Sequence, residues 1–479
     1  MGPFLFVILP KNRFQLQPHE YPVHLKVMIY KYALIFGFLA SASTLLAGQT
    51  WTLEDCLKQA KSKSILMETA KLREQAADVS ITQAKINRNP SISANINNTL
   101  YDNPFDDGPK DHYRLSVGLN GSWTIWDGGV TSLSTEASEL NKQAVLQNTR
   151  QTERTLQENV LNAYMNLLAS QEKLRTADAS VELAQAEFEN YTKLFEAGAI
   201  TKKDLTQSQS NVLQKQAALL TAQLGVNTSK TTLRQLMELD ASEEFEVTDP
   251  NVDISSPDSL EAIPPYDQLL ADIRKASPGL KSDSIAIQVA QKNTKVASKN
   301  SSISISLGAS AGTGIQAWHT EGNTSNIPAT TTTTTTSSDE NRFVRQLKGS
   351  YQHSLSLGIS IPIVDRGATE SKVLQAQINE AESQMALMEA SKNLENNIEK
   401  LYLNAVSADM QWKAALLQLE AETEATAVAE EQRNAGALTY TDFLSQKNNL
   451  ENAKVTLTNA KYTSLLARKL LDLYQGKMD

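Results

Sequence analysis

Residues 194–205 read LFEAGAITKKDL and residues 432–443 read QRNAGALTYTDF, so nearly the same twelve residues occur twice, 238 positions apart. Each stretch lies between long runs with helical periodicity. A glycine in such a place suits the left-handed residue that ends a helix, and a threonine three residues later suits the N-cap of the next one. The glycines are Gly198 and Gly436, and the threonines are Thr201 and Thr439. Each stretch therefore predicts the tip of a tight antiparallel helical hairpin.

An acidic residue follows each threonine. Asp204 and Asp442 fall at the third helical position, where a carboxylate can complete a capping box and lies near the positive end of the helix dipole. Ala199 and Ala437, which follow the glycines, keep both tips compact. The residues alone predict helix caps at these positions.

The similarity between the two halves of the chain extends beyond the tips. Asp127 and Gly129, in WDGG, have the same separation from Asp365 and Gly367, in VDRG. Both pairs lie between an alternating segment and a helical run, so they predict strand-to-helix turns. The second half has additional residues ahead of this turn, including seven consecutive threonines, 330–336. The chain therefore contains an internal two-fold repeat, with a threonine-rich loop in its second copy.

The alternating segments predict strands. In YRLSVGLNGSWTI (113–125) and YQHSLSLGISIPI (351–363), apolar residues alternate with polar ones, and weaker alternation begins at Ser91 and Ser302. A half-buried sheet of a soluble protein would show the same period of two. Here the polar face is mostly Ser, Gly, Asn and Thr, and the segments have about the 9 to 11 residues that cross a bilayer. We therefore expect membrane strands, with an exposed loop at 306–349.

The helical runs have coiled-coil spacing. In the first copy, apolar residues recur every seven positions: Val160, Leu167, Leu174, Val181, Phe188 and Phe195. Residues 129–198 could form one helix about 100 Å long at about 1.5 Å per residue. The return helix after Thr201 covers only half of that distance. We expect the helical segments at 52–88 and 266–299 to continue the layer.

The N-terminal region predicts export. Residues 33–47, ALIFGFLASASTLLA, follow Lys31 and have the apolar middle and small-residue end of a secretory signal. Such signals rarely lie so deep, so we expect translation to start at Met28 and cleavage to occur near Ala47, with Ala42 as the alternative. The expected regions are an over-extended N-terminus plus signal peptide (1–47), a first repeat (48–239, with a β-hairpin at about 91–126 and a tip at 197–204), an acidic linker (240–262), a second repeat (263–476, with a β-hairpin at about 302–363 and a tip at 435–442) and a tail (477–479).

Several classes of function find no support in the composition. The formal net charge of -9 argues against nucleic-acid binding. Cys56 is the only cysteine, so no internal disulfide can form, and the acidic residues before it do not suit a lipid-attachment site. The histidines after the signal, His112, His319 and His353, have no metal-ligand spacing. We expect no metal, no cofactor and no catalytic site, and therefore no enzyme.

Four strands per chain are too few for a closed membrane barrel, which needs at least about eight. Strands must therefore be shared among chains, and three chains would supply about twelve. The repeat, the Asp-x-Gly turns and the paired G-A-[IL]-T-x-x-D tips resemble the TolC-like outer membrane efflux protein family over roughly residues 50–476. The resemblance implies an α+β fold in which a long antiparallel α-helical coiled-coil barrel is continuous with a transmembrane β-barrel of four strands per protomer.

The resemblance also implies partners and sites. It predicts a homotrimer with twelve strands in outer membrane lipid, a large periplasmic part, a periplasmic adaptor (membrane fusion protein) and an inner membrane transporter. The tips would contact the adaptor through Gly198, Ala199, Thr201, Gly436, Ala437 and Thr439. Asp204 and Asp442 would line the aperture of the tunnel, a role that is compatible with capping.

We therefore predict an outer membrane channel that exports small molecules or proteins in a Gram-negative type of cell. The alternative is a trimeric coiled-coil surface or structural protein without transport activity, which would not need paired amphipathic strands. A periplasmic enzyme would need a reactive group of residues, and none is visible. The sequence does not specify the transported substrate.

Overall fold

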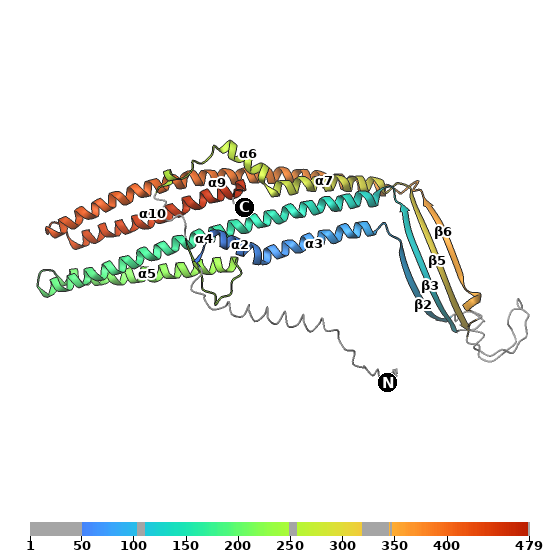
Figure 1. The fold of residues 1–479 in the computed structure, drawn as a ribbon, viewed down its shortest axis with the longest axis horizontal. Helices are drawn as coiled ribbons and strands as arrows, with labels where there is room; N and C mark the ends of the chain where they lie inside the picture. The colour runs from blue at the N-terminus through green and yellow to red at the C-terminus, as the bar shows by residue number, and fades with distance from the viewer. Residues whose placement is uncertain (1–49, 103–110, 249–255, 319–343, 345–346, 478–479) are drawn as a thin grey trace, which may run out of the picture.

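Long helices form an extended body with a sheet at one end (Figure 1). This computed structural model describes residues 50–102, 111–248, 256–318, 344 and 347–477. The tips of two helical hairpins lie at the end opposite the sheet (Figure 1). The export signal expected within residues 1–47 and the threonine run lie outside the described residues.

The two halves of the chain have matching elements in the same order. The first half contains α2 (Leu53–Lys63), α3 (Ile65–Ile86), β2 (Ser91–Asp102), β3 (Asp111–Trp126), α4 (Val130–Glu196) and α5 (Lys202–Leu236). The second contains α6 (Tyr266–Ala276), α7 (Pro278–Lys299), β5 (Ser304–Trp318), β6 (Gln352–Ser360), α9 (Ala368–Asn434) and α10 (Tyr440–Gln475). Helices α4 and α9 have 67 residues each, and α3 and α7 have 22 each. The short elements are β1 (Thr50–Trp51), its parallel partner β4 (Glu246–Val247) and the 3-10 helix η1 (Pro257–Ser259).

Serine residues divide the shorter helical segments. The sequence predicted helical segments at 52–88 and 266–299, and the structure has two helices in each. Ser64 ends α2 and begins α3, and its hydroxyl accepts a hydrogen bond from the amide two residues later, at 3.2 Å. Ser277 does the same between α6 and α7, with the amide three residues later, at 3.4 Å. Because each hydroxyl replaces a backbone acceptor, the helix direction can change there without leaving the first amides unpaired.

The helices form one layer that has two open edges. In the half near the sheet, α3, α4, α7 and α9 pack side by side in that order. In the half near the tips the order is α5, α4, α10 and α9. Helices α4 and α9 run the length of the body in Figure 1. One edge is therefore α9, and the other is α3 followed by α5.

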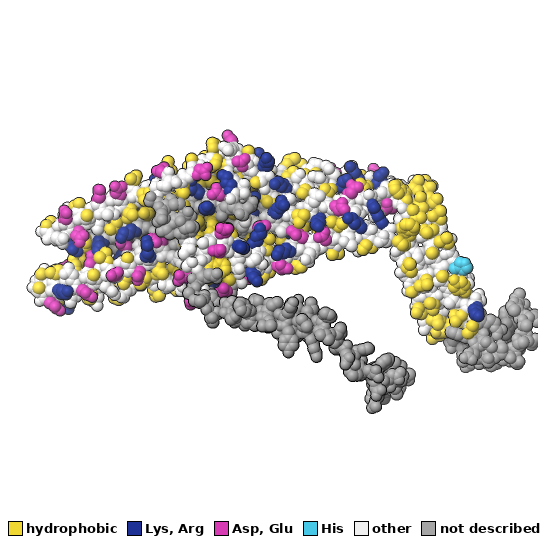
Figure 2. Space-filling model, in the orientation of Figure 1, with side chains coloured by type: hydrophobic (Ala, Val, Ile, Leu, Met, Phe, Trp, Pro, Cys, Tyr) yellow, Lys and Arg dark blue, Asp and Glu magenta, His cyan; other side chains and the backbone are white. Residues whose placement is uncertain are grey.

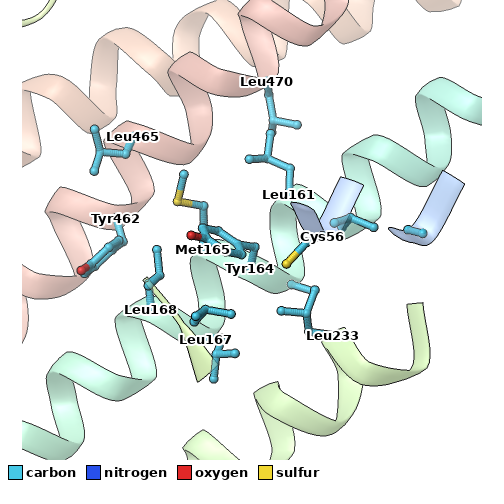
Figure 3. Close-up of a cluster of buried hydrophobic side chains, with 14 of the residues drawn as sticks. Cys56, Leu161, Tyr164, Met165, Leu167, Leu168, Leu233, Tyr462, Leu465 and Leu470 are labelled. Atoms are coloured by element: carbon cyan, nitrogen blue, oxygen red, sulfur yellow. The ribbon is translucent and has the colours of Figure 1, made fainter. Parts of the chain in front are cut away.

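The largest hydrophobic core lies at the middle of α4, where both halves of the chain meet. Leu161 and Met165 of α4 lie among Cys56 of α2, Leu233 of α5 and Leu470 of α10 (Figure 3). The side chain of Cys56 has no exposed surface, and its burial raises the pKa of the thiol to about 12. Cys56 is thus a buried residue of helix α2.

The four long strands form one sheet in the order β2-β3-β5-β6, and every neighbouring pair is antiparallel. The register places Ser116 opposite Asn97 and Gly314, and Ser310 opposite Ser354, so the polar residues of all four strands share a face. Exposed apolar residues occupy the other face, including Ile92, Ile96, Leu119, Leu355, Leu357 and Ile359. Strands β2 and β6 are the two edges of the sheet.

Two strand boundaries differ from the prediction. Residues 306–318 belong to β5, so the exposed loop expected from residue 306 does not begin there. Their small residues allow close packing, because a Cβ added to Gly314 would lie 2.9 Å from the Leu115 carbonyl of β3. Strand β6 ends at Ser360, before the predicted end at Ile363, because Pro362 has no amide hydrogen to donate.

Within the described part of the chain, no helix combines the length and the apolar character that a membrane-crossing helix needs.

Candidate functional site

The first tip joins α4 to α5 through paired capping motifs. Gly198 has a φ of 71°, and the amide of Ala199 donates to the carbonyl of Leu194 at 2.8 Å, which satisfies the end of α4. At the start of α5, the hydroxyl of Thr201 accepts from the amide of Asp204 at 3.3 Å. The Asp204 carboxylate accepts in return from the Thr201 amide at 3.2 Å. The predicted hairpin tip and capping box are therefore present.

The second tip has the same backbone but a less complete cap. Gly436 has a φ of 73°, and the amide of Ala437 donates to the carbonyl of Gln432 at 2.9 Å. The Thr439 hydroxyl accepts from the amide of Asp442 at 3.2 Å and donates to its carboxylate at 2.6 Å. The structure places Asp442 on an exposed surface and Asp204 in a half-buried position. The two carboxylates thus hold equivalent cap positions in different surroundings.

Both tip glycines have open space around them. A Cβ added at Gly198 or Gly436 would meet no atom within 4 Å. A side chain there would therefore not obstruct contact between helices of the same chain. Within one chain, only the left-handed φ requires glycine at these two positions. The space beside each glycine is open to another molecule.

Aspartates organise both strand-to-helix turns. The Asp127 carboxylate accepts from the amides of Gly129 at 3.1 Å and Thr131 at 2.8 Å. Asp365 makes the same bonds, to Gly367 at 3.1 Å and Thr369 at 2.8 Å. These bonds satisfy the first amides of α4 and α9 at the point where the chain leaves the sheet.

The two turns hold their carboxylates in the charged form. At Asp127, burial acts to raise the pKa, but hydrogen bonds from Thr131 and Gly129 outweigh it and hold the pKa below its usual value. At Asp365, hydrogen bonds from Thr369 lower the pKa in the same direction. The caps are therefore fully formed at neutral pH and weaken only when acid protonates the carboxylates.

A cluster near the tips, which the sequence did not predict, joins the two hairpins. Tyr191 of α4 packs against Tyr440 of α10, with ring centroids 4.3 Å apart, and burial raises the pKa of Tyr191 to about 12. Arg433 of α9 lies 4.2 Å above the ring of Phe443. Lys447 of α10 forms a half-buried ion pair with Glu187 of α4. Tyr191 lies three residues after Phe188 of the heptad series, which is a coiled-coil core spacing, but no sequence feature identifies its partner on the other hairpin.

Helix α9 carries an apolar stripe along its open edge. Its members, all exposed, are Leu374, Ile378, Met385, Met388, Leu403, Val406, Met410, Leu417 and Val428. At about 100° per residue they fall within an arc of about 80°. No described element of the same chain covers this stripe, whose Met410 and Leu417 are 64% and 67% exposed.

The opposite edge of the layer is also apolar. Along α3, Ile65, Leu72, Val79 and Ile86 are exposed and recur every seven residues. Along α5, Leu213, Leu220 and Leu224 are exposed. The two edges of the helical layer are thus both apolar but are built from different helices, just as β2 and β6 are the two different edges of the sheet.

Charged side chains gather on the helical body and are sparse on the sheet (Figure 2). Among the described residues, no three His, Cys, Asp or Glu side chains are grouped so that they could hold a metal ion. The arrangement of faces, edges and tips is therefore the feature on which an assignment of function depends.

Comparison with known proteins identifies one family. A family model described as outer membrane efflux protein matches residues 56–238 and 269–477. The chain is 24% identical to the outer membrane protein TolC of Escherichia coli K12 over 377 residues, which cover 73% of this chain and 72% of TolC. Among solved structures, the open-state MtrE channel of Neisseria gonorrhoeae is similar, with a TM-score of 0.68, 18% identity and coverage of 89% of this chain and 88% of MtrE. VceC of Vibrio cholerae is similar, with a TM-score of 0.67, 16% identity and coverage of 88% and 96%.

Proposed function

The chain belongs to the outer membrane efflux protein family, and from this premise we propose how its faces, edges and tips build a conduit. It is an outer membrane channel of a tripartite efflux system in a Gram-negative type of cell. Its family and its fold are those of channels rather than enzymes. Such channels work with an adaptor and an inner membrane transporter.

The observation that carries the proposal is the pair of unlike open edges on one chain. The α9 edge of one copy would pack against the α3 and α5 edge of the next copy. Because the two edges differ, the same contact can repeat from copy to copy around an axis until the ring closes. The same step would pair strand β6 with strand β2 of the next copy. We infer that three copies close the ring, because channels of this family are trimers. Three sets of four strands then give about twelve, which is above the lower limit of about eight for a membrane barrel.

The faces of the sheet suit such a ring. The apolar face would meet lipid, and aromatic residues lie towards both of its ends, with Tyr113 at one and Trp123 and Trp126 at the other. The face of Ser, Asn, Thr and Gly would line a watery passage. The turns at Asp127 and Asp365 would then lie where the membrane barrel meets the helical tunnel. The equal lengths of α4 and α9 support the view that residues 48–239 and 263–476 are two copies of one unit.

The tips are the proposed contact with the adaptor. Gly198, Ala199 and Thr201 form one compact turn, and Gly436, Ala437 and Thr439 form the other. The free space above both glycines supports docking by another protein. Residues 1–47 remain, in this proposal, an over-extended start and an export signal, and 240–262 remain the acidic linker.

Conductance and mass measurements test the ring. Native mass spectrometry of the purified protein in detergent should give a trimer, and planar bilayers should show stable single-channel steps. A trimer that conducts no ions would favour the structural surface protein instead. Monomers and dimers alone would show that the ring does not form.

A double substitution tests the proposed aperture. Asp204→Ala with Asp442→Ala removes two carboxylates per chain and should weaken the preference of the channel for cations. The matched control is Glu196→Ala with Glu431→Ala, which removes two exposed carboxylates from α4 and α9, the other helices of the same two hairpins. Reversal potentials in a salt gradient measure the selectivity. An equal shift in both double variants would assign the preference to general tip charge rather than to these aspartates.

A further inference from the structure

The polar face of the sheet carries one charged side chain among those that the structure describes. Residues that share this face by register are Ser91, Ser93, Asn95, Asn97 and Thr99 of β2, Arg114, Ser116, Asn120, Ser122 and Thr124 of β3, Ser306 and Ser310 of β5, and Gln352, Ser354, Ser356 and Ser360 of β6, with glycines between them. Arg114 lies opposite Thr99 and Gln316, toward the end of the sheet that is remote from the helices. Its positive charge therefore lies in an uncharged polar surface.

Arg114 lines a hollow in this face. The hollow has a volume of about 560 Å³, and its polar lining includes Asn95, Asn120 and Gln352. Gly312 and Gly314 are also part of the lining, and an added Cβ would lie 3.2 Å from the Val117 carbonyl at the first and 2.9 Å from the Leu115 carbonyl at the second. Because backbone of the neighbouring strand blocks a side chain at both positions, the hollow is a built feature of the strand pairing.

The groups around the hollow are suited to an anion. The amide of Asn120 donates to the Asn95 side-chain oxygen at 2.7 Å, which leaves the amide hydrogens of Asn95 available as donors. Within the described residues, the Arg114 guanidinium has no ion-pair partner, and no carboxylate lines the hollow. A guanidinium beside neutral donors binds carboxylate and phosphate groups in two-point geometry. A single exposed arginine could also be merely solvated, but the hollow gives it neighbouring donors and room for a solute.

We propose that Arg114 makes this end of the channel a binding site for small solutes that carry carboxylate or phosphate groups. The proposal rests on the proposed ring, in which three copies place three Arg114 side chains around one passage. The acidic tips lie at the other end of helices that are about 100 Å long. This separation exceeds the screening length of about 10 Å at about 0.1 M salt, so the charges at the two ends act independently and can be tested separately.

The test uses single channels of the full-length trimer in planar bilayers. Trivalent ions are added on the side of the bilayer opposite the helical body, where the Arg114 end of the sheet lies. Citrate, which carries three carboxylates, should reduce the current through the unmodified channel, and Arg114→Gln should raise its half-inhibiting concentration at least about fivefold at about 0.1 M salt. Arg114→Lys keeps the charge but not the two-point geometry of the guanidinium, so its half-inhibiting concentration should lie between those of the unmodified channel and Arg114→Gln. Hexaamminecobalt(III), a trivalent cation of comparable size, should not lose potency in Arg114→Gln.

Lys348→Gln is the matched control, because Lys348 is an exposed cation at the same end of the sheet but does not line the hollow. An equal loss of block in Lys348→Gln would overturn the site in favour of general surface charge. Unchanged block in Arg114→Gln, in channels of normal conductance, would overturn it outright. A protein that conducts no current at all would instead contradict the proposed ring.

Discussion

At the scale of single residues, one position in the strand-to-helix turns is occupied differently in the two halves. Gly128 and Arg366 both follow the capping aspartate, with φ of 71° and 57°. A Cβ at Gly128 would lie 2.2 Å from the Cβ of Ser302. Gly128→Ala should therefore destabilise the protein by about 1 to 3 kcal/mol, whereas Arg366→Gly should stabilise it by up to about 1 kcal/mol. Melting temperatures in detergent that move in the same direction for both variants would contradict this account.

Cys56 provides a pH prediction at the same scale. Its burial raises the pKa of the thiol to about 12, above the usual 9.0, so the folded state favours the neutral form. The resulting stability is fully present below about pH 9 and is lost as pH rises towards 12. We expect iodoacetamide to leave the native protein unlabelled at pH 8 to 9 and to label it rapidly after denaturation. Rapid labelling of the native trimer would show that the core around Cys56 opens.

At the scale of elements, substitutions at the helical tips can distinguish an effect on folding from an effect on docking. Gly198→Val and Gly436→Val should each cost about 1 to 2 kcal/mol, because valine must adopt a left-handed φ, yet they should leave the trimer intact. Transport and cross-linking to the adaptor should fall, since the added side chain enters the docking space. Gly225→Val is the control, because Gly225 also has no neighbour within 4 Å of an added Cβ but lies inside α5 with an ordinary φ. Full adaptor cross-linking in the tip variants would exclude these turns from the contact.

Elements with local chemical signals could be predicted from the sequence. The tips could be predicted because glycine, threonine and aspartate occur within seven residues in each. The turn at Asp127 could be predicted because it lies between a strand pattern and a helix pattern. The serine breaks in the shorter helices were missed, because apolar periodicity continues through them. The pairing of Tyr191 with Tyr440 was missed as well, because it joins residues far apart in the chain whose contact depends on how two hairpins pack.

At the scale of the whole molecule, the stripe on α9 is the surface that must be covered. Met410→Lys with Leu417→Lys places two ammonium groups on it, and each would cost several kcal/mol if buried without a partner. We expect native mass spectrometry to show loss of the trimer, while circular dichroism still reports helices. Gln411→Lys adds a charge beside the stripe on the same exposed helix and should leave the trimer intact. A trimer of normal stability in the double variant would place the interface elsewhere.

The two unlike edges of the layer also have a genetic consequence. A copy with a damaged α9 edge still has an intact α3 and α5 edge, so it can join a growing ring. The ring that contains this copy then cannot close. When damaged and normal genes are expressed together, the damaged subunits should therefore hold normal subunits in rings that cannot close. Damage to both edges of the same copy should remove this dominance, because such a subunit cannot enter the ring at all.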